Sequence, residues 1–118
     1  PRRVEVCEDW HATVASFQRD TADWLAIEPN LSASQWTPEQ QATYAATALA
    51  MESNAATLQD LGIRSGNPIF QDFATLAAQY RRAYVSAIPS YTPSDNYLAS
   101  VASQLVAAID AACSSVEQ

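Results

Sequence analysis

Both glycines of this 118-residue chain, Gly62 and Gly66, lie in one short segment near its middle, residues 58–68. Glycine adopts positive φ angles at little steric cost, so the backbone reverses most easily in this segment. We therefore expect one helical hairpin before it and another after it. Within the segment, Gly62 is predicted to take the left-handed conformation that follows a helix end, with Ile63 contacting Leu58.

The composition favours helix along the whole chain. Alanine is the commonest residue, and β-branched residues are scattered along the chain. The length allows one domain with one apolar core. We predict an all-α fold, a single antiparallel up-down four-helix bundle that spans residues 1–118. The sequence begins at proline rather than methionine, which is compatible with a fragment of a longer anchored or secreted protein.

Three of the predicted helices begin with capping sequences. Thr37 is followed by proline and then by glutamine in the third position, and Thr92 by proline and then by aspartate. In each case the threonine can cap free amide groups while the third residue returns a hydrogen bond. Asn67 before a proline caps the third helix, and Pro89 ends it. The first helix is placed over residues 4–27.

Each predicted helix carries an apolar stripe at helical spacing, which we expect to face the core. The stripes are Cys7, Trp10, Val14, Phe17, Thr21 and Trp24 on the first helix; Tyr44, Ala48, Met51, Ala55 and Leu58 on the second; Ile69, Phe73, Leu76, Tyr80, Ala83 and Ala87 on the third; and Leu98, Val101, Leu105, Ile109 and Ala112 on the fourth. Much of this predicted core is alanine, so the few large side chains must fill the space between the helices.

An up-down bundle brings Cys7 and Cys113, from opposite extremes of the chain, to the same end of the molecule. They are the only cysteines in the sequence. We predict a disulfide between them; the alternative is two buried free thiols that pack as small apolar residues. A disulfide implies an oxidising compartment, so the predicted location is extracytoplasmic: secreted, periplasmic or attached to the cell envelope.

The opposite end of the predicted bundle collects apolar and aromatic residues from the two connections. Leu31, Trp36, Tyr91 and Tyr97 form the candidate partner-binding surface, because exposed apolar patches on soluble domains mark contacts with other molecules. The alternative is that Trp36 and Tyr91 fold back and plug the end of the bundle.

The sequence argues against several classes of function. The formal charge is -7 with no lysine, which argues against nucleic-acid binding. His11 is the only histidine and has no second ligand at metal-binding spacing, so we predict no metal and no cofactor. Without a nucleophile elbow or a phosphate-binding glycine loop, we predict no enzymatic activity. Arg81 and Arg82 are interpreted as charges that complement a helix dipole.

Two resemblances bear on the source of the chain. The alanine-rich, lysine-free style with a predicted terminal disulfide resembles exported helical domains of actinobacterial, mycobacteria-like cell-envelope proteins. The segment from Tyr91 to Asp95 is similar to the Tyr-xxx-Asp element in substrates of mycobacterial type VII secretion systems. That family also carries a Trp-x-Gly turn, which this sequence lacks, and the resemblance covers five residues, so we transfer no function from it.

These observations favour a non-enzymatic extracytoplasmic interaction or structural domain of a cell-envelope protein, with a protein partner. No apolar run approaches the ~20 residues of a membrane span, so we expect membrane attachment only through an upstream anchor. The alternative function is a carrier for a small apolar ligand or lipid, held between helices where small residues leave room. These residues are Ala48, Ala55, Ala77, Ala83 and Ala108.

Overall fold

The structure is a computed structural model that describes residues 3–116, and the side chains of residues 5–115. Its helices are α1 (Arg3–Asp20), α2 (Ala22–Leu25), α3 (Pro38–Arg64), α4 (Pro68–Ala87) and α5 (Asn96–Val116), with short 3-10 turns η1 (Ala33–Gln35), η2 (Ile88–Ser90) and η3 (Pro93–Asp95). Within this part of the chain there is no β-strand. The prediction of an all-α chain with four long helices is confirmed.

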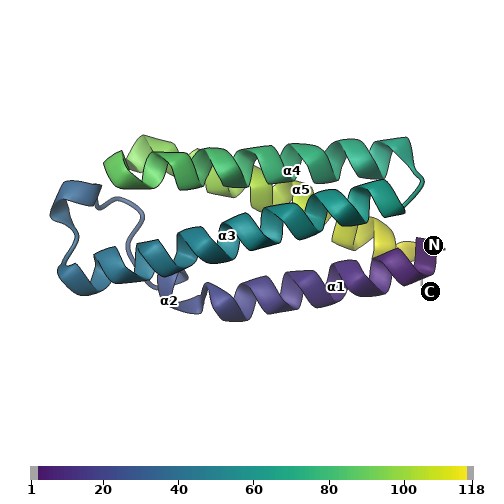
Figure 1. Cartoon of the computed structure of the whole chain (residues 1–118), viewed down its shortest axis with the longest axis horizontal. Helices are drawn as coiled ribbons and strands as arrows, with labels where there is room; N and C mark the ends of the chain where they lie inside the picture. The colour runs from purple at the N-terminus through teal and green to yellow at the C-terminus, as the bar shows by residue number, and fades with distance from the viewer. Residues whose placement is uncertain (1–2, 117–118) are drawn as a thin grey trace.

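The four long helices lie side by side in a rod that measures 46 × 22 × 19 Å, and each runs antiparallel to the previous one (Figure 1). Around the rod the long helices follow the order α1, α3, α4, α5. Among neighbouring pairs, the contact between α3 and α4 is the most extensive and the contact between α1 and α5 is the least extensive. The described chain ends and the α3–α4 turn lie at one end, which we call the terminal end. The connections α2–α3 and α4–α5 form the other end.

The predicted helix caps are present. The Thr37 hydroxyl accepts from the backbone N–H of Gln40 at 3.1 Å, and the Gln40 side chain accepts from the Thr37 N–H at 2.9 Å. Asn67 Oδ1 accepts from the first two free amide groups of α4 at 2.9 and 3.0 Å. The Asp95 carboxylate accepts from the Thr92 N–H at 2.9 Å, where η3 leads into α5. These starts follow directly from local sequence.

The prediction of one continuous helix over residues 4–27 is wrong. The helix is interrupted at Thr21, and only the four-residue α2 follows. Thr21 is 1% exposed, and its hydroxyl donates to the Phe17 carbonyl at 2.7 Å. A threonine that bonds back to the preceding turn bends a helix, so the buried side chain explains the change of direction.

The predicted role of Gly62 is also wrong. Gly62 lies inside α3, which continues to Arg64, and the left-handed residue is Gly66, with φ 65°. Ile63 is 65% exposed and does not close the turn as an apolar contact. A Cβ atom at Gly62 would lie 2.8 Å from the Cβ of Ala74, so this glycine permits α3 and α4 to approach closely.

The prediction of which face of α4 points inward is also wrong. Ile69 is 69% exposed, and Phe73 and Leu76 are exposed as well. The buried face instead consists of residues that follow the same helical spacing: Ala74, Ala77, Ala78, Arg81 and Tyr84. Near Gly62 this face consists of alanines because α3 lies so close to it, and Ile69, Phe73 and Leu76 are left outside.

The buried face of α5 is displaced by one position from the prediction. Its buried residues are Ala99, Ala102, Val106, Ile109 and Cys113, whereas Leu98, Val101 and Leu105 are half-buried and Ala112 is exposed. Contrary to our expectation, residues 93–115 are long and apolar enough, by length and composition, to cross a membrane, with a mean hydropathy of 1.3. One such helix is weak evidence for a span, and here α5 packs against α4 and α1.

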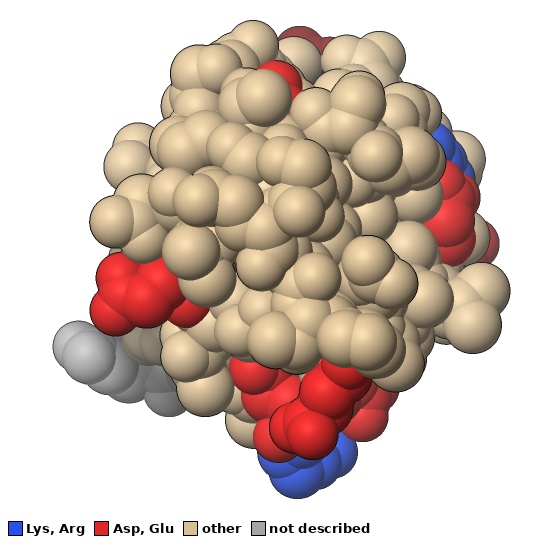
Figure 2. All heavy atoms as spheres, turned by 90° about the vertical axis from the view of Figure 1, so that its left-hand side faces the viewer, with Lys and Arg blue, Asp and Glu red and all other residues tan. Residues whose placement is uncertain are grey.

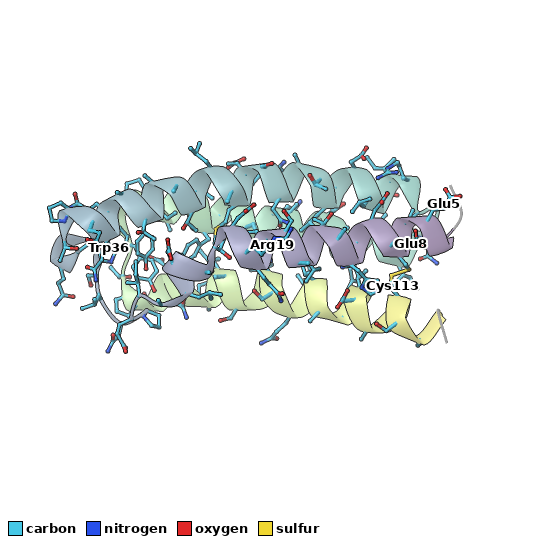
Figure 3. All side chains as sticks on the ribbon, turned by 90° about the horizontal axis from the view of Figure 1, so that it is seen from below. Glu5, Glu8, Arg19, Trp36 and Cys113 are labelled. Atoms are coloured by element: carbon cyan, nitrogen blue, oxygen red, sulfur yellow. A yellow bond between two sulfur atoms is a disulfide. The ribbon has the colours of Figure 1, made fainter. Side chains whose placement is uncertain are left out.

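Cys7 and Cys113 are paired as a disulfide at the terminal end, with their Cα atoms 5.3 Å apart (Figure 3). Both residues are almost fully buried in one of two apolar clusters. The bond joins α1 to α5 across 106 positions of sequence. In the chain-entropy model, a closed loop of this size stabilises the folded state by about 4–5 kcal/mol.

We predict that Gly62→Ala lowers the free energy of unfolding by about 1–3 kcal/mol, because the added methyl group overlaps Ala74. In a helix without such a contact, the same change stabilises by about 1 kcal/mol, so the sign of the effect is informative. Urea denaturation of the single variants and of Gly62→Ala/Ala74→Gly measures it. The double variant should lose less than the sum of the two single losses; a strictly additive result would contradict the close contact.

Candidate functional site

The aromatic end, defined by Trp36, Tyr44, Tyr84 and Tyr91, is a packed cluster. The rings of Trp36 and Tyr44 stack with centroids 3.7 Å apart, and Tyr91 lies 5.7 Å from Trp36. Trp36 is 8% exposed and Tyr91 is 1% exposed. Trp36 and Tyr91 are therefore buried between the helices and close this end of the rod, as the alternative interpretation of the sequence had it.

Hydrogen bonds fix the phenols of this cluster. The Tyr91 hydroxyl donates to the Pro29 carbonyl at 2.6 Å, and Trp24 Nε1 donates to the Tyr84 hydroxyl at 3.0 Å. Burial raises the pKa of Tyr91 to about 12, with further contributions from Tyr44 and Asp95, and burial also raises the pKa of Tyr84. Both phenols therefore stay neutral at physiological pH.

The other two candidate residues lie nearer the surface. Leu31 is half-buried against the aromatic cluster, and Tyr97 on α5 is 59% exposed. Figure 2 shows that the face of the molecule at this end is mostly uncharged, with acidic groups towards its margins. Of the four residues predicted to bind a partner, Tyr97 is the one that offers most of its side chain to solvent.

A second apolar surface lies at the terminal end, where the sequence predicted none. Ile69, Phe73 and Leu76 form an exposed stripe on α4, which we call the α4 stripe. Beside it, a groove of about 360 Å³ runs between α4 and α5 next to the disulfide. This α4–α5 groove is lined by Cys7, Asn67, Ile69, Phe70, Phe73, Ala108, Ile109, Ala112 and Cys113. All but one of these side chains lack a nitrogen or oxygen atom.

The middle of the molecule holds a polar layer between two apolar clusters. One cluster contains Trp10 and the disulfide, and the other is the aromatic end. Between them, Arg81 extends from α4 to the diagonally placed α1, where its guanidinium carbon lies 4.0 Å from the centroid of the Phe17 ring. Burial lowers the pKa of Arg81 to about 10, so the side chain remains charged at neutral pH. Neither Arg81 nor Arg82 lies in the last turn of α4, so our interpretation of both as charges that complement its dipole is wrong.

Arg82, the neighbouring residue, differs from Arg81 in both its burial and its pairing. It is half-buried, it donates to the Gln59 side chain, and it lies 3.6 Å from a Glu52 carboxylate oxygen. The periodicity of the buried alanines on α4 identifies Arg81 as the inward member of the pair. We assigned the larger apolar residues of α4 to the core, and the inward position of Arg81 was missed for that reason.

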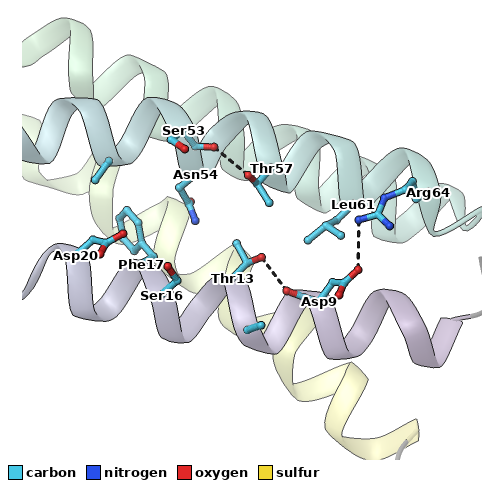
Figure 4. A pocket seen from close by; sticks show the side chains of 12 residues that line it. Asp9, Thr13, Ser16, Phe17, Asp20, Ser53, Asn54, Thr57, Leu61 and Arg64 are labelled. Atoms are coloured by element: carbon cyan, nitrogen blue, oxygen red, sulfur yellow. Dashed lines mark hydrogen bonds and ion pairs between the residues drawn. The ribbon is translucent and has the colours of Figure 1, made fainter.

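Two openings flank the middle of α1. Figure 4 shows the α1–α3 groove, of about 360 Å³, into which Asn54 points from α3. Its walls carry Asp9 and Asp20, and Arg64 lies 3.4 Å from Asp9. On the other side of α1, the α1–α5 cavity has a volume of about 250 Å³ and reaches Arg81. The openings exist because α1 packs less closely than the other long helices.

His11 on α1 pairs with Asp110 on α5, and each side chain is about one-third exposed. Among the described residues, no group of three or more His, Cys, Asp or Glu side chains is arranged to hold a metal ion. The pair contributes to the contact between α1 and α5.

Comparison with known proteins identifies the family. The model of the mycobacterial ESX-1 associated protein family matches residues 2–117. The chain belongs to this family. It is also 44% identical, over 108 residues, to an uncharacterised protein of Mycolicibacterium smegmatis (strain MKD8). That match covers 92% of this chain and 29% of the relative, so the chain spans less than a third of the relative's length. No solved structure matches the chain.

Trp36→Ala in this ESX-1 associated chain is expected to lower the free energy of unfolding by about 3–5 kcal/mol, because it removes the ring that stacks on Tyr44. Tyr97→Ala should change it by less than about 0.5 kcal/mol, because this side chain is mostly exposed. Chemical denaturation followed by circular dichroism measures both. Equal stability of the wild type and Trp36→Ala would contradict the role of Trp36 as a plug.

Arg81→Met is expected to raise the free energy of unfolding by about 1–3 kcal/mol, because a buried charge without an anionic partner is replaced by an apolar side chain. The folded-state pKa of Arg81 lies below its unfolded value, so the penalty is fully present at neutral pH and declines only above about pH 10. The matched control is Arg82→Met, which should change stability by less than about 1 kcal/mol. Thermal and urea denaturation at pH 7 report both, and destabilisation by Arg81→Met would contradict the assignment.

Proposed function

We propose that the chain is a non-enzymatic protein-interaction domain that acts outside the cytoplasm in ESX-1-related secretion. The family description supports a role connected with this secretion system. The proposed architecture is an up-down four-helix bundle that presents one fixed face to a protein partner. The observation that carries the proposal is the α4 stripe together with the α4–α5 groove.

The chemistry of this surface fits an amphipathic helix of a partner protein. Ile69, Phe73 and Leu76 are spaced by four and three residues, so they form one ridge along α4. Beside the ridge, the groove offers an apolar depression of about 360 Å³. Amphipathic helices bind such surfaces through side chains at matching spacing. Exposed apolar surface of this kind on a soluble domain marks a contact with another molecule.

Charge favours a different protein over a second copy of this chain. The formal charge of the chain is -7, so two copies repel each other. α5 contributes a single charged residue, Asp110, over its length, which leaves the groove itself nearly neutral. We infer a partner helix with apolar residues on one face and basic residues flanking them.

The disulfide supports the extracytoplasmic part of the proposal. Structural disulfides persist in oxidising compartments and are rare in the cytosol. Cys7 and Cys113 also line the groove, so the bond between them fixes one of its walls, α5, against α1. A surface held in this way loses little entropy when a partner binds.

The test uses the full-length protein in its native host. Phe73→Asp and Ile69→Asp place a charge on the α4 stripe, and each is expected to abolish the protein's contribution to ESX-1-dependent secretion, measured in culture filtrates. A photo-crosslinking residue at position 73 should capture a defined protein component of that secretion system. Leu49→Asp is the matched control, because Leu49 is 75% exposed on α3.

Fold and abundance are checked by circular dichroism and immunoblotting. Normal secretion with Phe73→Asp, at normal abundance, would contradict the proposed docking surface. A crosslink from position 73 to lipid alone, or to a second copy of the chain, would contradict the proposed occupant. Equal loss of secretion with Leu49→Asp would show that the effect does not depend on the groove.

A further inference from the structure

Two buried polar side chains in the middle of the molecule lack hydrogen-bond partners. Arg81 is 4% exposed, and within the described part of the chain no hydrogen bond or ion pair joins it to another residue. Asn54 is 9% exposed, and its Oδ1 accepts no hydrogen bond there. Buried polar groups in native proteins are almost always paired. The charged group, Arg81, is the more costly of the two to bury without a partner and therefore requires a physical explanation.

Both residues line the α1–α5 cavity. Its rim includes exposed residues of α1 and α5, among them Gln18, Ser103 and Ala107, and its floor includes the buried Leu58 and Val106. The cavity therefore leads from solvent to the polar layer. Most of its lining is apolar, Arg81 is its only basic residue, and its only acidic residue, Asp110, is paired with His11.

We propose that the α1–α5 cavity binds a small molecule that carries one carboxylate on an apolar body. The carboxylate accepts hydrogen bonds from the Arg81 guanidinium, whose Nε has no partner among the described residues. Arginine suits this role because its planar fork matches the two oxygens of a carboxylate. The apolar body lies against Phe17, Leu58 and Val106, in a space of about 250 Å³.

Charge balance selects this class of ligand over others. One buried guanidinium is neutralised by one negative charge, and a dianion such as a phosphate monoester leaves an excess charge in an apolar site. A neutral apolar molecule fills the cavity but leaves Arg81 unpaired. A cation is opposed by Arg81 itself. The neighbouring α1–α3 groove suits an anion less well because two carboxylates, those of Asp9 and Asp20, line it and its one arginine, Arg64, is already paired with Asp9 and Asp60.

Cation–π contact with Phe17 does not remove the need for an anion. Such a contact offsets only part of the free-energy cost of burying a charged group. The aromatic ring covers one face of the guanidinium, and the N–H groups at its edge remain available as donors. Phe17 therefore orients Arg81 towards a ligand in the plane of the guanidinium.

The experiment compares octanoate with octanol on the disulfide-bonded protein, using isothermal titration calorimetry at pH 7. Octanoate should bind one site saturably, and at least about tenfold more tightly than octanol, because a hydrogen bond to a charged group contributes more than the 1.4 kcal/mol that corresponds to a factor of ten. Arg81→Gln should remove this preference, and Arg81→Lys should restore part of it. Arg82→Gln is the matched control and should retain wild-type binding.

A second variant tests the location without altering Arg81. Ala107→Trp places a bulky group at the exposed rim of the cavity, so the protein should keep its fold while octanoate binds at least about tenfold more weakly. Absence of saturable octanoate binding by the wild type would overturn the proposal. So would equal binding of octanoate and octanol, or wild-type binding by a folded Ala107→Trp protein. None of these results depends on the α4–α5 groove.

Discussion

The close contact between α3 and α4 determines which side chains of this protein are available for binding. Gly62 and Ala74 meet where no additional methyl group fits, so the face of α4 that turns towards α3 must be built from small residues. The larger apolar residues of α4 are then left on its outer side, where they form the α4 stripe. Arg81 follows the alanines inward because it shares their face of the helix. One packing constraint therefore produces both the exposed apolar surface and the buried charge.

The buried charge in turn divides the interior. Trp10 and the disulfide lie in one apolar cluster and the stacked aromatic rings in the other, with Arg81 and Asn54 between them. A layer of this kind lowers stability relative to continuous apolar packing, because a desolvated arginine has lost its hydration without gaining a counterion. The two clusters and the disulfide must offset that cost. The position of the charge is thus better explained by binding than by folding.

Local sequence determined the helix starts, since Thr37, Asn67 and Thr92 each act on amide groups within three residues. The cysteine pairing could be predicted from the order of the helices. The inward face of α4 could not, because Ile69, Phe73 and Leu76 have the same helical periodicity as Ala74, Ala77 and Arg81. The distance between α3 and α4 distinguishes these two sets, and that distance depends on Gly62, which lies on the other helix. For the same reason neither the α4 stripe nor the cavity at Arg81 could be predicted from the sequence.

α1 contributes residues to both surfaces, Cys7 to the α4–α5 groove and Phe17 to the α1–α5 cavity. It is held in place near its two ends and is loosely packed between them. The disulfide and the hydrogen bond from Trp10 Nε1 to the Val106 carbonyl, 3.2 Å long, hold one part against α5. Beyond the bend at Thr21, Trp24 Nε1 donates a hydrogen bond to the Tyr84 hydroxyl. Between these points, the contact of Phe17 with Arg81 is flanked by an opening on either side. Segments with few buried contacts open at the lowest free-energy cost. A molecule that reaches Arg81 therefore enters beside the loosely packed middle of α1.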